Sequence, residues 1–307
     1  MAVTAATTLG GFSGFLNRDQ AGPIFERAAQ MSVVQQLARQ VPLGGNGVSV
    51  PVVTGRLSAG WVAEGAAKPA SAGTMSLKTM DPKKLAVIAV VSAEVVRANP
   101  GNYMNLIREQ VAEAFAIGFD KAALYDQGPD GTAGAGPFST YIAQTTKNVE
   151  IGTATDGGIY SDIVAGLSLL VADGKRLTGF ALDSEVEPMI LGALDGNGRP
   201  LFVDLPTDDT SAAAARPGRL LGRPSFMGDG VASDTAANVL AFGGDWTQAA
   251  WGTVGGISYD VSTEATVTIN GAYVSLWENN LVAVRAEAEY GWLVNDTAAF
   301  VKYADAS

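Results

Sequence analysis

Hydrophobic and small or polar residues are distributed over residues 48–92 in a pattern that organises the rest of the chain. An extended apolar arm, Val48–Val53, leads into a region of small residues, Gly60–Ser71, and the chain returns as Met75–Lys78 and Leu85–Ser92. Two β-branched arms on either side of a Gly/Ala/Pro/Ser segment predict a long two-stranded hairpin. Because an isolated hairpin is only marginally stable in water, we expect its arms or tip to be covered, with a neighbouring copy of the chain as the candidate.

A helical period dominates the residues that follow the hairpin. Asn99 and Pro100 offer a cap and a proline at the first helical position, and Gly101–Asp126 is predicted to form a long helix. Its apolar side chains recur close to every 3.6 residues and give one hydrophobic face. At 1.5 Å per residue this helix would be roughly 37 Å long, a candidate spine for the molecule. A shorter amphipathic helix, Ile24–Arg39, is predicted before the hairpin.

Beyond a glycine-rich break at Gly128–Gly136, helical and extended segments alternate. The elements predicted there are helix Tyr160–Ala172, strand Leu177–Leu182, helix Glu185–Leu194 and short strands near 219–221, 239–242 and 257–261. The last segment is predicted to form strands Leu281–Ala288, Gly291–Val294 and Ala298–Tyr303. A period of two in the first of these strands indicates one packed face and one face in water or in contact. The mixture predicts an α+β fold.

The composition favours a protein that buries surface by assembling. Hydrophobic residues make up 47% of the 307 residues and charged residues only 17%, below the quarter that is usual in soluble proteins. The chain has a formal net charge of −11, and its 20 basic residues are scattered. Since a nucleic-acid-binding groove needs clustered Lys and Arg, the sequence argues against such a groove, and any nucleic acid nearby would be contained rather than gripped.

Cysteine and histidine are both absent. This excludes a disulfide framework, thiolate chemistry and catalysis with histidine as the general base. Zinc would need an all-carboxylate site, which is unusual for it. The N-terminus lacks the features of a signal peptide, and no apolar run is long enough to cross a bilayer. We therefore predict a cytosolic product that is not an enzyme, with no catalytic, cofactor or metal residues and no membrane partner.

Two acidic motifs are better explained by local structure than by chemistry. Asp195–Arg199 begins like a calcium loop, but arginine stands at the third ligand position and the twelfth position lacks glutamate. Asp183, Glu185 and Glu187 could form an acid–base group or a cation site, yet helix-start electrostatics accounts for the two glutamates. A hydrolase or a binding module is therefore a minor alternative.

The tip of the predicted hairpin carries side chains suited to contact between subunits. Glu64 and Lys68, four residues apart, could form a charged inter-subunit contact or could simply be solvated. Trp61 favours contact, because a large aromatic side chain is costly to leave in water. The other predicted inter-subunit contact residues are Arg108, Glu109, Arg285 and Glu287.

The order of elements resembles the major capsid protein of tailed double-stranded DNA phages, the HK97-like fold family. The stretches similar to that family's pattern are Trp61–Gly65 with Lys68–Ser71, Lys84–Val96, Ala112–Gly128, Asp195–Phe202, Leu221–Pro224, Phe242–Trp246 and Asn280–Tyr303. They occur in the family's order and cover nearly the whole chain from about Ile24.

The resemblance implies a division of the α+β chain into four parts. Residues 1–47 would form an N-terminal arm and short helix, and 48–92 the extended hairpin (E-loop). Residues 93–150 and 257–307 would form the peripheral (P) domain with its sheet and the spine helix, and 151–256 an α/β axial (A) domain.

It also implies a structural role in a virion capsid assembled in the cytoplasm of a bacterial host. The chain would assemble with itself into hexamers and pentamers of an icosahedral head, enclosing double-stranded DNA without sequence-specific binding. A separate scaffolding protein, a portal and a decoration protein are further partners that the resemblance allows. An encapsulin-type nanocompartment shell is the alternative within the same fold, distinguished by what its particles contain.

Two features of some family members are not matched here. A long N-terminal scaffolding segment precedes the hairpin in some members, whereas this hairpin begins at Val48, so a separate scaffold or none is implied. Others cross-link Lys to Asn between subunits. Lys68, Lys78 and Asn279 or Asn280 supply those residue types, but no glutamate matches the catalytic one, and we expect no cross-link.

Overall fold

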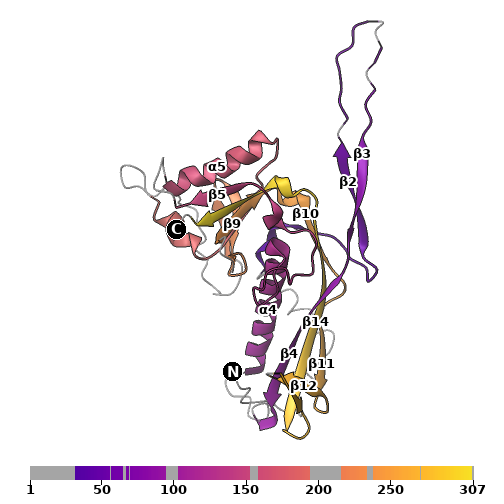
Figure 1. Cartoon of the computed structure of the whole chain (residues 1–307), viewed down its shortest axis with the longest axis vertical. Coiled ribbons are helices and arrows are strands. Elements are labelled where there is room, and N and C mark those ends of the chain that lie inside the picture. The colour runs from indigo at the N-terminus through magenta and orange to yellow at the C-terminus, as the bar shows by residue number, and fades with distance from the viewer. Residues whose placement is uncertain are drawn as a thin grey trace.

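The computed structural model describes residues 32–55, 57–64, 67–68, 70–94, 103–152, 158–193, 216–233, 238–269 and 271–305. They form a long hairpin, an elongated sheet with a long helix beside it, and a broader α/β unit, an α+β arrangement (Figure 1). The first half of the predicted helix Ile24–Arg39 and the whole turn Asp195–Arg199 lie outside the described residues.

The projecting hairpin consists of β2 (Val48–Gly55) and β3 (Thr74–Met80), paired antiparallel with Val48 opposite Met80. The prediction that Leu85–Ser92 continues its returning arm was wrong. Those residues belong to β4 (Lys83–Ser92), which pairs antiparallel with β14 (Leu281–Val294) in the body. Alternate side chains of β4 pack on the hydrophobic core there, and that burial outweighs further pairing within an exposed hairpin.

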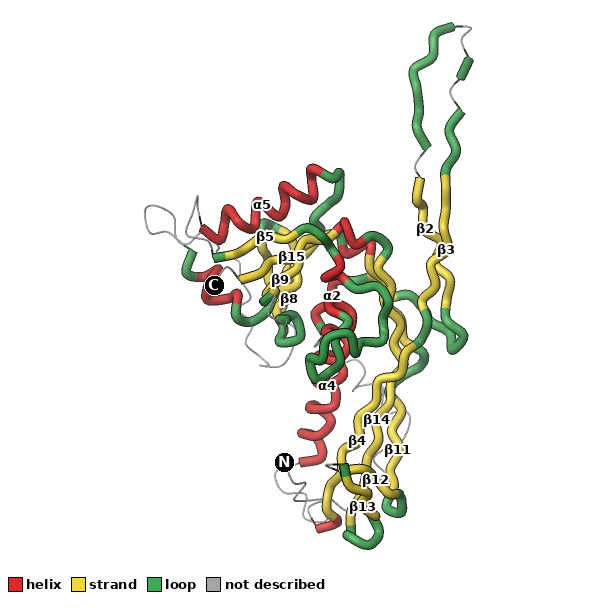
Figure 2. Tube along the Cα trace, viewed as in Figure 1, coloured by secondary structure: helices red, strands yellow, loops and turns green. Residues whose placement is uncertain are grey.

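Strand β14 is the central strand of the elongated sheet (Figure 2). It pairs with β4 along one edge, and with β10 (Ala249–Thr253) and β11 (Ser258–Ser262) along the other. The two-residue strand β1 (Arg39–Gln40) pairs in parallel with β10. A small hairpin of β12 (Thr266–Ile269) and β13 (Ala272–Ser275) extends the far end, as Figure 2 shows.

A glycine explains why one strand was predicted as two. The sequence suggested a break near Gly291, but β14 runs unbroken for 14 residues. A Cβ atom at Gly291 would lie 2.7 Å from both Met80 Cγ and Leu43 Cδ2. The glycine therefore lets the root of the hairpin approach the strand, without interrupting it.

The α/β unit is built on a six-stranded sheet in the order β5-β15-β9-β6-β8-β7. Its strands are β5 (Asn148–Ile151), β6 (Gly179–Leu182), β7 (Arg216–Leu220), β8 (Arg223–Met227), β9 (Val239–Gly244) and β15 (Phe300–Asp305). Helix α5 (Gly158–Ala172) packs on β5 and β15, next to α6 (Val186–Leu191). Short 3-10 turns are Ile142–Gln144, Trp246–Gln248 and Thr297–Ala299.

Two strands lie in a different sheet from the one that the predicted domain boundaries imply. β15 was expected with the other C-terminal strands, but it pairs with β5 and β9 in the six-stranded sheet. β10 lies within the segment 151–256, yet it pairs with β14 in the elongated sheet. The chain therefore passes between the two sheets from β9 to β10 and again from β14 to β15.

Helix α4 (Tyr103–Tyr125) agrees closely with the predicted spine. Its buried side chains include Val111, Phe115 and Phe119, which follow the helical period. The helix ends at Asp126, whose φ of 57° is left-handed, and Gly136 N donates to Asp126 O at 3.0 Å. A Cβ atom at Gly136 would lie 2.5 Å from the Asp126 carbonyl carbon, so only glycine fits this return of the chain.

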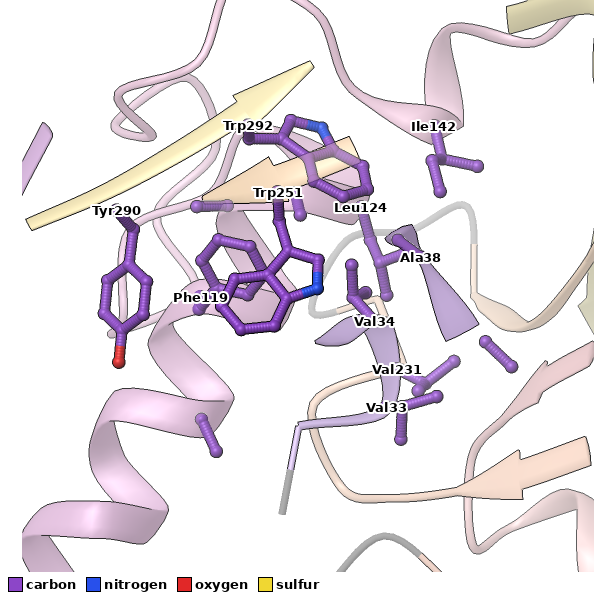
Figure 3. Close-up of a cluster of buried hydrophobic side chains, with 14 of the residues drawn as sticks. Val33, Val34, Ala38, Phe119, Leu124, Ile142, Val231, Trp251, Tyr290 and Trp292 are labelled. Carbon is purple, nitrogen blue, oxygen red and sulfur yellow. The ribbon is translucent and has the colours of Figure 1, made fainter. Parts of the chain in front are cut away.

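Phe119 is the centre of the core between α4 and the elongated sheet (Figure 3). Its ring centroid lies 5.1 Å from that of Tyr290, 6.0 Å from Trp292, 6.1 Å from Phe138 and 6.3 Å from Trp251. Such separations are favourable for aromatic pairs. The short helix α2 (Val33–Leu37) closes the same cluster with fully buried Val33 and Val34.

We predict that Phe119→Ala lowers the free energy of unfolding by about 3–5 kcal/mol, because it leaves a cavity among four other aromatic rings. Urea unfolding followed by tryptophan fluorescence measures the change. Val171→Ala, on the exposed side of α5, is the control and should change it by less than about 0.5 kcal/mol. Similar midpoints for the two variants would contradict the central position of Phe119.

Candidate assembly surfaces

The distal part of the hairpin presents apolar side chains to solvent. Trp61 is fully exposed, and Leu57, Met75 and Leu77 are each about 70% exposed (71%, 67% and 72%). The described residues between β2 and β3 form no strand, and Ser58 N donates to Ser71 Oγ at 3.2 Å across the arms. Exposed large apolar side chains gathered on one projection are typical of an interaction surface.

Glu64 and Lys68 are exposed at the same end of the hairpin as Trp61. No ion pair joins Glu64 to Lys68 among the described residues. In the single chain the two charges therefore lie near Trp61 and in solvent, and their contact with a neighbour stays a prediction.

The root of the hairpin is firmly attached to the body. Met80 is fully buried and packs with Leu43 and Leu293 in a small cluster of its own. Lys78 Nζ donates to the carbonyl oxygens of Val294 at 3.1 Å and Asn295 at 2.7 Å. These contacts set the angle at which the hairpin leaves the elongated sheet. Sequence reasoning noticed Lys78 only as a cross-linking residue type, because its carbonyl partners are distant in sequence.

Arg285 and Glu287 lie on the exposed face of the elongated sheet and are engaged within their own chain. Arg285 Nη2 donates to Asp260 Oδ2 at 2.6 Å, and Arg285 Nε lies 3.3 Å from Glu287 Oε1. Lys84 Nζ lies 3.2 Å from Glu287 Oε2. The hydrogen bond to Asp260 and the charge of Glu287 raise the pKa of Arg285. A network thus spans β11, β14 and β4.

The predicted contact residues do not converge on one place. Glu109 is exposed on α4, far from the hairpin tip in Figure 1, and the side chain of Arg108 lies outside the described residues. Three separate surfaces result: the tip, the spine helix and the sheet face. One surface was missed, where Tyr273 and Trp277 are 85% and 77% exposed beside β13. The Asn270–Gly271 pair in the sequence is a hairpin-turn signal that could have located it.

A buried carboxylate ties α2 to the spine. Asp120 is 2% exposed and accepts hydrogen bonds from Ser32 Oγ at 2.6 Å, Val33 N at 2.8 Å and Val34 N at 3.2 Å. Burial raises the pKa of Asp120 to about 7, although these three donors oppose the shift. The sequence alone does not reveal this link, because the partners of Asp120 lie 86 to 88 positions away from it.

Asp183 has a structural role rather than a chemical one. It is 5% exposed, and its two oxygens accept from Glu185 N at 3.0 Å and Ala232 N at 3.1 Å. Burial raises the pKa of Asp183. The carboxylate joins the start of α6 to the turn after β8, which explains it without catalysis. Within the described residues, no group of three or more acidic side chains is placed to hold a metal ion.

The described helices include none that is both long and apolar enough to cross a bilayer. The described residues form an extended hairpin, a spine helix along an elongated sheet, and a separate α/β unit. This combination defines the HK97-like class of shell-forming proteins.

Comparison with known proteins gives the family. The model of the Phage capsid family matches residues 13–305, and the chain belongs to that family. It is 45% identical over 296 residues to "Probable major capsid protein gp17" of Mycobacterium phage D29, covering 94% of this chain and 90% of the relative. The corresponding protein of Mycobacterium phage L5 is 44% identical over 302 residues, with 95% and 89% covered.

A solved structure from Gordonia phage Cozz has a TM-score of 0.71 and 25% identity, covering 90% of this chain and 87% of that chain. These findings confirm the predicted HK97-like fold and the role of a structural phage major capsid protein, a component of the virion capsid, over the encapsulin alternative.

We predict that Lys78→Met loosens the hairpin without unfolding the body. Loss of the two hydrogen bonds from Nζ should speed amide exchange and proteolysis within residues 48–80, while α4 stays protected. Hydrogen exchange with mass spectrometry measures this. Lys68→Met, at the exposed tip, is the matched control, and equal exchange in both variants would argue against attachment through Lys78.

We also predict that stability depends on the protonation of Asp120. Its pKa is about 7 in the folded chain and about 4 when unfolded, so the folded state binds this proton more tightly. The contribution is complete below pH 4 and is lost as the pH rises through 7, by about 2 kcal/mol between pH 5 and 7. Tyr290, the ionisable neighbour on β14, has a pKa raised by burial and stays neutral.

Urea unfolding at pH 5, 6, 7 and 8 should therefore show wild-type stability falling relative to Asp120→Asn, which cannot titrate. The difference should level off above pH 7. A difference between the two proteins that is constant with pH would contradict a raised pKa in the folded state.

Proposed function

We propose that the chain assembles with itself into hexamers and pentamers of an icosahedral head that encloses double-stranded DNA. Its role is structural and not enzymatic, and assembly takes place in the cytoplasm of a bacterial host. The observation that carries this proposal is the hairpin, whose root is buried in the body while Trp61, Leu57 and Leu77 stand in solvent.

The exposed hairpin gains stability only by lying on another copy. Its two strands cannot bury both faces against each other, so a neighbour supplies the missing apolar surface. In a closed ring the same contact is made once by every subunit, so modest contacts add up by symmetry. In this proposal the elongated sheet with α4 corresponds to the peripheral domain and the six-stranded unit to the axial domain.

The charged contact residues fit this arrangement as proposed interfaces. Trp61, Glu64 and Lys68 would meet a neighbour at the tip. Glu109 with Arg108 on the spine helix, and Arg285 with Glu287 on the sheet face, would form the rim of further contacts. Rim charges of this kind set orientation and specificity more than affinity.

The acidic charge fits a container for DNA. With a net charge of −11, the subunit lacks the excess of basic residues that would hold phosphates and give strong, salt-dependent binding. Packaged DNA would be enclosed without sequence-specific contacts. A separate scaffolding protein, a portal and a decoration protein are the further partners we propose for assembly.

An enzymatic function has little support in the described residues. A polar groove of about 800 Å³ lies between the hairpin root and the α/β unit, but several of its charges are paired. Lys175 pairs with Asp296, and Asp173 Oδ2 lies 2.6 Å from Lys147 Nζ, a contact that lowers the pKa of Asp173. Paired charges of this kind stabilise structure and are poorly suited to act as a general base.

Deletion of Ala63–Ser71 tests the proposal. The subunit should keep its body fold by circular dichroism and fail to form stable closed particles in electron micrographs, whereas the wild type forms them. Replacing the same residues by a Gly/Ser segment of equal length is the control that separates side-chain contacts from hairpin length. Normal shells from the deletion variant would reject the role of the tip, and a wild-type chain that stays monomeric at high concentration would reject shell assembly.

A further inference from the structure

A pocket of about 170 Å³ lies beside the C-terminal part of the spine helix, next to the root of the hairpin. Four segments line it: the start of β4, the part of α4 that contains Gly118 and Phe119, the loop that follows the helix, and β14 at Tyr290. Its walls are mainly apolar and include Leu85, Phe138 and the ring of Tyr290. Its size and aromatic lining suit one large aromatic side chain.

Two polar features of the pocket narrow the choice of occupant. Gln127 lines it, is 1% exposed, and has a buried Oε1 with no hydrogen-bond partner among the described residues. A buried acceptor of this kind is costly unless a donor reaches it. At the rim, Lys84 is paired with Glu287, whereas Lys83 is exposed and forms no ion pair with any described residue. The occupant should therefore combine an aromatic body, an N–H donor and a nearby negative charge.

The hairpin tip carries that combination. Trp61 is fully exposed, its indole Nε1–H can only donate, and Glu64 lies three positions further along the chain. The tip cannot reach the pocket of its own chain, because the 13 residues from Val48 to Trp61 extend roughly 40 Å away from the root. Figure 1 shows the tip at the far end of the molecule from α4. Another copy has to supply it.

We propose that Trp61 of one subunit inserts into this pocket of a second copy. Its indole N–H donates to Gln127 Oε1, and Glu64 faces Lys83. The proposal rests on the shell assembly argued above and adds the particular receptor for the tip. It also accounts for two features that the single chain leaves unsatisfied, an indole in solvent and a buried amide oxygen without a donor.

Photo-crosslinking tests the contact directly. Chains with p-benzoylphenylalanine in place of Trp61 are co-assembled with an excess of ¹⁵N-labelled wild type, irradiated as intact particles and analysed by mass spectrometry. We expect the unlabelled tip peptide to be joined to a labelled peptide that contains Lys83–Leu85 or residues 118–138. Crosslinks to other segments, crosslinks within one chain, or their absence from assembled particles would each overturn the proposal.

The same probe at Trp277 is the matched control and should not reach the pocket peptides, because Trp277 is exposed just after β13, which lies at the opposite end of the molecule from the hairpin in Figure 2. Wild-type particles form in either case if the proposed function is right. Particles with crosslinks elsewhere therefore refute only the pocket, whereas failure of wild-type assembly refutes the proposed function.

Charge reversal gives a second test without a probe. Glu64→Lys and Lys83→Glu should each lower the yield of particles by about fivefold, because like charges then face each other at every copy of the contact. The double variant should recover most of the wild-type yield. A double variant as poor as the worse single variant would contradict the pairing of Glu64 with Lys83.

Discussion

A two-stranded hairpin has two faces and no interior, and this constraint underlies the architecture of the chain. Strands β2 and β3 satisfy each other's backbone hydrogen bonds, but their side chains have only solvent to face beyond the root. The free energy that this part lacks in the single chain has to come from contact with another molecule. The hairpin is thus a surface for assembly, held away from the body.

The root of the hairpin fixes the direction in which the exposed strands leave the body. Met80, Leu43 and Leu293 form a small core separate from the one around Phe119, and Gly291 provides the close approach that this packing needs. Lys78 adds two hydrogen bonds to backbone carbonyls at the end of β14. A ribbon fixed only at one end can keep its angle while its tip remains available, which suits a contact that has to be made identically by many copies.

The spine helix links the other parts of the molecule. Phe119 packs against β10 and β14 of the elongated sheet, while Asp120, the next residue, holds α2 in place through three hydrogen bonds. Helix α2 in turn packs against the six-stranded sheet. Burying a carboxylate without a cation is unfavourable, so the burial of Asp120 lowers stability. Its three hydrogen bonds in turn fix the path of the chain before the hairpin.

Local pattern alone determined the elements with a strong period. The spine helix, the extended arms near 48–53 and 75–78, and helix α5 follow from the local pattern of side chains, and the missing Cys and His removed whole classes of chemistry. The place of Trp61, Glu64 and Lys68 between the two arms also followed from the small residues around them, while their contact with a neighbour stays a prediction. What tertiary structure decided was pairing: β4 with β14, β15 with the six-stranded sheet, Asp120 with Ser32, and Lys78 with the end of β14. A period shows which face of a segment is apolar, but not which distant segment will cover it, because that depends on the combined burial of residues far apart in the chain.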